Sequence, residues 1–436
     1  MMVFRKRSAA VGVPMDGMVS RVRLQGAKNA VLPLLYAAVA LGGRTRLLNA
    51  PSGILDFHSN VKVLRSIGVH IDVSAATVDI RAEELDFSGL DQAAAARTRY
   101  SSLLMGLAQA RGRPLHMALP GGCSFGRPLD IHFDFFRASG ATLDVDTNGI
   151  KLHPGSAGEH TFRLRFPSVG ASINALIASA CSASPVVLEN LSVEPEVLDV
   201  VQFLANRGVD IRFRSERVLR LCGPATHGLA IWPIMPDRIE AMTLVFASIL
   251  ARRRLCLVNV RAQDLMTGLE VLGRMNVPFS VDTTRSEVVV YGDRCGAMKP
   301  CRVTTSPHPG FPTDLHPVLA AVLSTVAGTS MIEEAVMGER FAYMEQLAAV
   351  GARLGRESGV VRLDGDPALR GCRDMVRVQA TDIRGGMAAL LLGLTAARQE
   401  VHLEQHEQVL RGYQDLGQIA QLFDFEQGAY ECATST

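Results

Sequence analysis

Several charged residues lie beside glycines in the loops of a chain that is otherwise rich in apolar residues. Arginines occur in the segments GERF at 338–341, ATDIRGG at 380–386 and LRGY at 410–413, and a lysine follows the glycine of QGAKNA at 25–30. Glycine allows a ligand to approach the backbone closely, and the planar guanidinium group of arginine binds carboxylate or phosphate with two hydrogen bonds. Together these segments indicate a site for a small, multiply charged anion.

Two further loops carry groups that can transfer a proton. The glycine-rich loop LPGGCSFGRPLD at 119–130 contains Cys123, and the proline-rich loop SPHPGFPTD at 306–314 ends at Asp314. A thiol and a carboxylate can serve as general acid and general base. Taken singly each residue is ordinary, because a lone cysteine is more often inert packing and a loop arginine usually faces solvent. Only the combination indicates an active site.

The composition excludes several classes of protein. Of the 436 residues, 48% are hydrophobic and 20% are charged, with a formal net charge of +2, so the chain can bury large cores and shows no basic stripe for nucleic acid. The eight cysteines form no CxxC pair and no zinc-like cluster with histidine. Neither a secretory signal nor a membrane-spanning stretch is found. We therefore expect a cytoplasmic protein with free thiols, no metal, no organic cofactor and no membrane contact; nothing indicates a protein partner.

A pattern of helix, short strand, second helix and turn recurs along the chain with a period of roughly seventy residues. About six units fill the chain, and the segment at 114–145 keeps only the second half of the pattern. The repeated pattern predicts an α/β protein with two similar lobes of three units each. The segments at 25–30 and 231–240 break the rhythm and are predicted to cross between the lobes, with ligands bound in the cleft. Matching turns into the last strand fall at Gly68, Gly140, Gly208, Asn276, Gly351 and near Phe423.

The motifs GAKNA, LPGGC with RPLD, PSVGAS, MPDRIE, SPHPGFPTD, ERF, ATDIR and LRGY occur in the order found in the enolpyruvyl transferases, and the whole chain resembles that family. The branch that acts on UDP-N-acetylglucosamine is the most similar, because the 3-phosphoshikimate branch (EPSP synthase) lacks the GGC loop. The resemblance implies a two-lobed, inside-out α/β barrel of six repeated βαβαββ units. Lobe I would comprise 1–28 plus 236–436, with residues for phosphoenolpyruvate, and lobe II would comprise 29–235, with the mobile cysteine loop and nucleotide contacts.

The same resemblance implies a reaction in which the enolpyruvyl group of phosphoenolpyruvate moves to a hydroxyl of a uridine nucleotide and phosphate leaves. Cys123 would protonate the methylene carbon, Asp314 would be the base at the acceptor hydroxyl, and Asp382 would assist around the reacting carbon. Lys28 is also counted among the catalytic residues. The residues implied to hold phosphoenolpyruvate are Lys28, Arg127 and Arg411 at its phosphate and Arg340 and Arg384 at its carboxylate. The residues implied to contact the acceptor are Asn29, Arg99, Leu129, Asp130, Ser168, Val169, Gly170, Asp314 and Val336.

The chain departs from the family pattern mainly on the acceptor side. The loop after Cys123 is one residue shorter before its arginine, and Phe166 stands where a lysine near the diphosphate is usual. Tyr100 replaces a small residue, and aromatic residues are replaced by Leu103 and Met337. Two acceptors therefore stay open: UDP-N-acetylglucosamine through its 3-hydroxyl, and UMP through its 3′-hydroxyl, as in a branch from nucleoside-antibiotic pathways. A non-catalytic nucleotide-binding paralogue and a 3-phosphoshikimate transferase are the alternatives.

Overall fold

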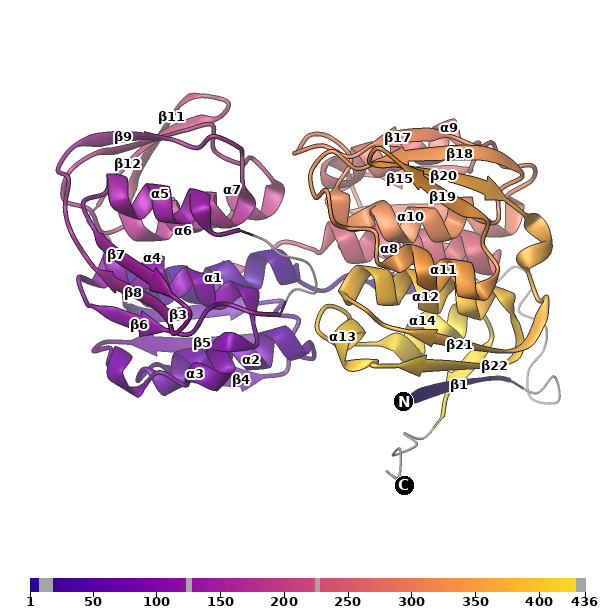
Figure 1. The fold of residues 1–436 in the computed structure, drawn as a ribbon, viewed down its shortest axis with the longest axis horizontal. Coiled ribbons are helices and arrows are strands. Elements are labelled where there is room, and N and C mark those ends of the chain that lie inside the picture. Colours follow the sequence, from indigo (N-terminus) through magenta and orange to yellow (C-terminus); the bar gives the residue numbers. More distant parts are fainter. Residues whose placement is uncertain (8–18, 123–127, 224–227, 429–436) are drawn as a thin grey trace. The chain divides into compact units, whose positions relative to one another are not determined.

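The computed structural model describes residues 1–7, 19–122, 128–223 and 228–428 (Figure 1). The chain divides into two compact units, each with its own hydrophobic core. Unit 1 comprises Met1–Gln25 and Pro236–Thr436, and unit 2 comprises Gly26–Met235. The chain passes between them at 25–26 and again at 235–236. Lys28 falls in unit 2 because the backbone N–H of Ala27 already bonds the carbonyl of Met235 and the first helix of that unit starts at Lys28.

The described part of unit 2 contains three sheets and the helices packed on them. The first sheet has the order β13 (Leu229–Pro233), β3 (Gly43–Leu48), β5 (Thr77–Ala82) and β4 (His70–Ser74). The second has the order β6 (Leu115–Met117), β8 (Gly149–His153) and β7 (Thr142–Asp146). The third has the order β11 (Asp210–Ser215), β12 (Val218–Cys222), β10 (Val186–Glu189) and β9 (His160–Arg163). The helices are α1 (Lys28–Leu41), α2 (Leu55–Ser66), α3 (Gln92–Ala96), α4 (Leu104–Arg111), α5 (Asp130–Ala138), α6 (Val169–Ser179) and α7 (Pro195–Asn206).

Unit 1 likewise shows three sheets over its described residues. The first has the order β21 (Arg373–Gln379), β22 (Ala397–Glu404), β1 (Met2–Lys6) and β23 (Phe425–Gln427). The second has the order β15 (Phe279–Asp282), β16 (Glu287–Tyr291), β14 (Arg254–Val258) and β2 (Ser20–Arg23). The third has the order β17 (Arg302–Thr304), β18 (Gly328–Glu333), β20 (Val360–Gly365) and β19 (Leu354–Glu357). The helices are α8 (Arg238–Ala251), α9 (Met266–Arg274), α10 (His316–Leu323), α11 (Tyr343–Val350), α12 (Ile383–Ala396), α13 (Glu407–Leu410) and α14 (Leu416–Leu422).

Three helices pack against one another at the centre of each unit: α1, α4 and α6 in unit 2, and α8, α10 and α12 in unit 1 (Figure 1). These helices are apolar on all sides rather than on one stripe, which is the pattern of a helix surrounded by protein. In α1, every residue but Asn29 is buried. The sheets lie outside these helices, so the expected inside-out α/β fold of repeated units is confirmed.

The repeat is visible in both strand pairing and backbone conformation. Each four-stranded sheet contains one parallel pair, such as β9 with β10, and two antiparallel pairs. The turns predicted from the sequence all have positive φ, where glycine and asparagine are favoured. Their φ angles are 92° at Gly68, 83° at Gly140, 88° at Gly208, 62° at Asn276, 120° at Gly351 and 62° at Asp424, the residue after Phe423.

The second unit of the repeat is incomplete, as the shortened pattern at 114–145 predicted. Its sheet has three strands among the described residues, and the position before α4 is taken by α3 and by the 3-10 turn η2 (Arg99–Leu103) instead of a strand. This irregular segment brings Arg99 and Tyr100 next to the start of α4. No helix in the described part of the chain is both long enough and apolar enough to cross a membrane.

Candidate active site

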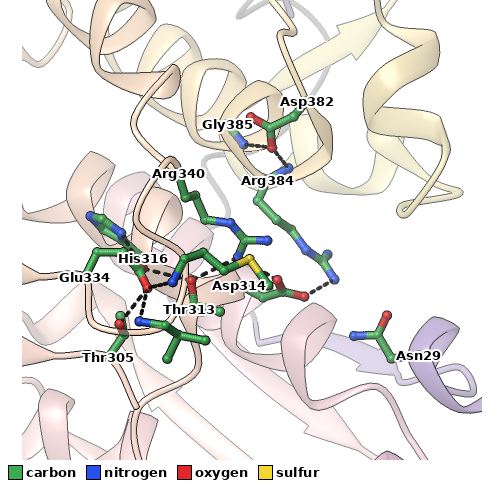
Figure 2. Close-up of polar contacts among 12 residues, drawn as sticks. Asn29, Thr305, Thr313, Asp314, His316, Glu334, Arg340, Asp382, Arg384 and Gly385 are labelled. Atoms are coloured by element: carbon green, nitrogen blue, oxygen red, sulfur yellow. Dashed lines mark hydrogen bonds and ion pairs between the residues drawn. The ribbon is translucent and has the colours of Figure 1, made fainter. Parts of the chain in front are cut away.

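The carboxylate of Asp314 lies between two arginine side chains of unit 1 (Figure 2). Its Oδ1 is 2.6 Å from Nη1 of Arg340, and its Oδ2 is 3.2 Å from Nη2 of Arg384. Both arginine side chains are almost fully buried, with 4% and 6% exposed, whereas Asp314 is 22% exposed. The 3-10 turn η5 (Thr313–Leu315) carries the aspartate to the start of α10. Two fixed cations at low solvent exposure form a strong binding position for a carboxylate.

Asp382 is the N-cap of α12 and fixes the point from which Arg384 extends. Its Oδ1 accepts hydrogen bonds from the backbone N–H of Arg384 at 2.9 Å and of Gly385 at 3.0 Å. The guanidinium group of Arg384 also lies over the ring of Tyr413, 5.2 Å from its centroid. Arg411 follows α13 and donates to Oε1 of Gln408 at 3.1 Å. These residues belong to one unit, although they come from distant loops in the sequence.

A network built on Glu334 lies beside Arg340 and Asp314 (Figure 2), and the side chains of Glu334 and His316 in it are fully buried. Burial disfavours the charged form of Glu334, but hydrogen bonds from His316, Met337 and Thr313 outweigh it and lower the pKa of this carboxyl to about 2. Burial lowers the pKa of His316, so its imidazole is neutral beside a charged carboxylate. Nδ1 of His316 therefore donates to Glu334 at 3.0 Å. Nε2 of His316 then accepts from the hydroxyl of Tyr343 at 2.7 Å.

A second carboxyl with a shifted pKa lies at the start of α8, on the partly buried residue Glu240. Burial, reinforced by the charge of Asp237, raises the pKa of Glu240 to about 8, while Arg384 opposes the shift. Asp237 caps the helix, because its Oδ1 accepts from the backbone N–H groups of Ile239 at 2.8 Å and Glu240 at 2.9 Å. Sequence reasoning identified the MPDRIE segment as a motif but singled out neither carboxylate, although the aspartate before a helix is a recognisable capping signal.

In unit 2, the amino-terminal end of α1 carries two of the predicted residues. Nζ of Lys28 is 2.7 Å from Oδ2 of Asp56, and both side chains are only 6% exposed. Oδ1 of the next residue, Asn29, accepts a hydrogen bond from the hydroxyl of Tyr100 at 2.9 Å. Nη2 of Arg99 donates to the carbonyl of Pro128 at 3.2 Å, which joins η2 to the loop before α5. Asp56 was not predicted from the sequence, because it lies on α2 and its partner Lys28 lies on α1.

The residues predicted to line the nucleotide lie at the starts of two helices of unit 2. Ser168 caps α6, with Oγ 3.4 Å from the backbone N–H of Ala171, and Val169 and Gly170 are the first two residues of that helix. A side chain at Gly170 would meet Nε2 of His132 at 3.2 Å, so glycine fits closely here. Burial lowers the pKa of His132 to about 3, so this imidazole is neutral.

The start of α5 carries Leu129, which is buried, and Asp130. Arg165 pairs with two carboxylates there: it contacts Asp130, and its Nη1 is 2.7 Å from Oδ2 of Asp134. Arg163 is 3.4 Å from Glu189. Beside them Phe166 is 37% exposed. Both arginines that neighbour Phe166 thus have carboxylate partners.

Two residues of the predicted set, Cys123 and Arg127, lie outside the described residues. Val336 donates its backbone N–H to Glu334 at 2.9 Å. Asp314, Arg340 and Arg384 are brought into contact from distant segments of unit 1. The convergence of the other predicted residues on a single cleft stays a prediction. Among the described residues, no three histidine, cysteine, aspartate or glutamate side chains are arranged to hold a metal ion.

Comparison with known proteins gives one consistent family. The sequence profile described as EPSP synthase (3-phosphoshikimate 1-carboxyvinyltransferase) matches residues 14–419. The chain is 32% identical over 380 residues to the UDP-N-acetylglucosamine 1-carboxyvinyltransferase 2 of Carboxydothermus hydrogenoformans, covering 87% of this chain and 89% of that protein. It is 30% identical over 408 residues to the UDP-N-acetylglucosamine 1-carboxyvinyltransferase of Halothermothrix orenii, covering 93% and 94%.

Two solved structures have the same fold. The enolpyruvyl transferase NikO from Streptomyces tendae superposes with a TM-score of 0.83 at 22% identity, over 98% of both chains. An EPSP synthase from Acinetobacter baumannii superposes with a TM-score of 0.71 at 16% identity, over 98% of this chain and 100% of that one. Both neighbours are less than 25% identical to the chain, so they support its fold.

Proposed function

The chain belongs to the EPSP synthase family and is an enolpyruvyl (carboxyvinyl) transferase, and from this premise we propose that it transfers the enolpyruvyl group of phosphoenolpyruvate to a hydroxyl of a uridine nucleotide. The observation that carries the proposal is the pair of buried guanidinium groups of Arg340 and Arg384 on either side of Asp314. Two such cations suit the carboxylate of phosphoenolpyruvate, and the carboxylate between them is a base within reach of the same position.

The reaction requires protonation of the methylene carbon and attack of the acceptor hydroxyl on the neighbouring carbon. Asp314 takes the proton of that hydroxyl, and Cys123, assigned from the sequence, supplies the proton to the carbon. The tetrahedral intermediate, whose methylene carbon has become a methyl group, then loses phosphate together with one methyl proton. That proton returns to the thiolate of Cys123, and the double bond of the enolpyruvyl group is restored in the product. Lys28, Arg127 and Arg411 offset the charge of the departing phosphate, since fixed cations stabilise charge that develops in a transition state.

For the acceptor, the residues around Phe166 favour a nucleotide with one phosphate, namely UMP. A lysine at this position would supply a cation for a second phosphate, and its absence matters only if no neighbour replaces it. Arg165 is held by Asp130 and Asp134, and Arg163 by Glu189. Since these guanidinium groups already have anionic partners, drawing either one to a diphosphate would break an existing ion pair.

UDP-N-acetylglucosamine is the second candidate acceptor. The relatives that are 30–32% identical over about nine-tenths of the chain carry the name UDP-N-acetylglucosamine 1-carboxyvinyltransferase. The ion pairs of Arg163 and Arg165 are exposed, so each stabilises the structure by at most about 1 kcal/mol and could be exchanged for a ligand contact.

A phosphate-release assay with phosphoenolpyruvate and four acceptors tests the proposal: UMP, UDP, UDP-N-acetylglucosamine and shikimate 3-phosphate. We expect turnover with UMP and weaker turnover with UDP-N-acetylglucosamine. Efficient turnover of UDP-N-acetylglucosamine with none of UMP would replace the first acceptor by the second. Tight nucleotide binding without phosphate release from any acceptor would instead support a binding protein and contradict the proposal.

A further inference from the structure

The two carboxylate oxygens of Glu334 bond to different parts of the site. Oε1 accepts from the hydroxyl of Thr305 at 2.8 Å and from the backbone N–H groups of Val336 at 2.9 Å and Met337 at 2.8 Å. The hydroxyl of Thr305 in turn accepts from the backbone N–H of Ala335 at 2.9 Å. This oxygen and the threonine together therefore fix the backbone of residues 335–337.

Oε2 of Glu334 bonds instead to the segment that carries Asp314. It accepts from the hydroxyl of Thr313 at 2.8 Å and from Nδ1 of His316 at 3.0 Å, the residues on either side of the 314–315 turn. Because the Thr313 hydroxyl donates its only hydrogen to Glu334, its oxygen must accept from Nη1 of Arg340, which is 3.3 Å away. A continuous chain of hydrogen bonds thus runs from Oε2 through Thr313 to the guanidinium group that holds Asp314.

We propose that Glu334 is a positioning residue whose two oxygens serve the two substrates separately. Oε2 aims Arg340 and Asp314 at phosphoenolpyruvate and the reacting hydroxyl, and Oε1 sets the 335–337 backbone, with Val336, against the acceptor. The assignment of Arg340 and Val336 to these substrates rests on the proposed function; the hydrogen bonds that link them to Glu334 do not.

A purely structural role for Glu334 is the alternative, because a buried carboxylate with satisfied hydrogen bonds also stabilises a fold. The two roles differ in what the loss of a single hydrogen bond does. A structural role predicts lower stability with no preference between the substrates. A positioning role predicts separate kinetic effects, because a small displacement of a catalytic group is costly even when the fold survives.

Thr313→Val and Thr305→Val form a matched pair, since each removes one hydroxyl that donates to Glu334 at 2.8 Å. We expect Thr313→Val to raise KM for phosphoenolpyruvate roughly tenfold and to lower kcat, with KM for the acceptor within about twofold of the parent. Thr305→Val should do the reverse and raise KM for the acceptor. Thr395→Val removes a buried hydroxyl that donates to the carbonyl of Leu391 within α12, and should change neither KM.

Equal changes of both KM values in the two variants, or none while Tm falls, would leave Glu334 with a structural role only. Thr313→Ser and Thr305→Ser keep the hydroxyl and should restore the parent kinetics, which guards against misreading a folding defect.

Calorimetric titration with phosphoenolpyruvate alone separates this inference from the proposed function. If the parent protein transfers nothing to any uridine nucleotide, that function fails, but weaker phosphoenolpyruvate binding by Thr313→Val and not by Thr305→Val still supports the Oε2 half of the inference. Equal phosphoenolpyruvate affinities in the parent and Thr313→Val overturn it.

Discussion

The hydroxyl of Tyr100 donates a hydrogen bond to Oδ1 of Asn29 at 2.9 Å, which ties the turn η2 to the start of α1. Asn29 is one of the predicted acceptor contacts, and Tyr100 stands at a position where the family resemblance implies a small residue. We therefore expect this hydrogen bond to affect the use of the acceptor.

Replacing Tyr100 with phenylalanine removes that donor and leaves Oδ1 of Asn29 available to a ligand. A hydrogen bond of about 1 kcal/mol corresponds to roughly fivefold, so we expect KM for the acceptor to change by about that factor while KM for phosphoenolpyruvate stays constant. Steady-state phosphate release measures both. Tyr291→Phe removes a hydroxyl in unit 1 that is 3.3 Å from Oγ of Ser280 and serves as the control. If only the KM for phosphoenolpyruvate changed, Tyr100 would affect phosphoenolpyruvate binding and not acceptor binding, and the prediction would be wrong.

Phe166→Lys should improve the use of UDP-N-acetylglucosamine relative to UMP. A hydrogen bond to a charged group contributes roughly 1.5–3 kcal/mol, so the ratio of the two kcat/KM values should shift by about ten- to a hundredfold. The control is Phe213→Lys, which adds the same charge at another exposed phenylalanine of unit 2. An unchanged ratio would mean that Arg163 or Arg165 already supplies the cation.

Asp314→Asn should separate the chemical step from phosphoenolpyruvate binding. Loss of a general base lowers kcat by about 10²–10⁴-fold. Because the asparagine no longer offers a negative charge to Arg340 and Arg384, both arginines become more available to the substrate carboxylate, and the affinity for phosphoenolpyruvate should hold or rise. Calorimetric titration measures the affinity, and phosphate release measures kcat. A kcat close to that of the parent would remove Asp314 from the reaction.

Glu240 should make the stability of the fold depend on pH between about 4.5 and 8. Its pKa is raised from 4.5 to about 8 in the folded protein, so the folded state holds a proton that the unfolded state has lost across that window. Stability from this group is complete below pH 4.5 and is lost as pH rises toward 8. Glu240→Gln mimics the protonated form. The Tm of this variant minus the Tm of the parent should therefore increase as the pH rises from 5 to 8. A constant Tm difference would show that the carboxyl is charged throughout.

Cys123 should be the cysteine that an epoxide phosphonate such as fosfomycin alkylates, as the family resemblance implies. Burial raises the pKa of three other thiols, those of Cys256, Cys295 and Cys301, so little of their reactive thiolate is present at neutral pH. Mass spectrometry of the labelled protein locates the adduct, with the exposed Cys181 and Cys372 as internal references. Cys123→Asp should resist labelling. First labelling at any other cysteine would contradict the assignment.

The architecture could be predicted from the sequence, because each repeat is encoded by local signals. Apolar residues on all sides of 28–41 predict a helix enclosed by protein, and the glycines and the asparagine at the repeated turns fit a positive φ that other residues adopt only with strain. The order of the motifs was sufficient to indicate the family. The short loops and helix starts also contain most of the predicted site residues, since a loop that holds glycine and arginine is recognisable without its partners.

Which charged groups meet depends on how distant segments pack, and this could not be predicted from the sequence. The alternation of β18, in which Ser330 and Ile332 are buried, puts Glu334 on the inner face and Glu333 on the outer one. That pattern does not show that the carboxylate of Glu334 meets two threonines and a histidine from other segments. The same holds for Asp56 beside Lys28 and for Asp130 beside Arg165. Helix and turn preferences act over a few residues, whereas these pairings depend on how distant segments pack, so no local pattern could specify them.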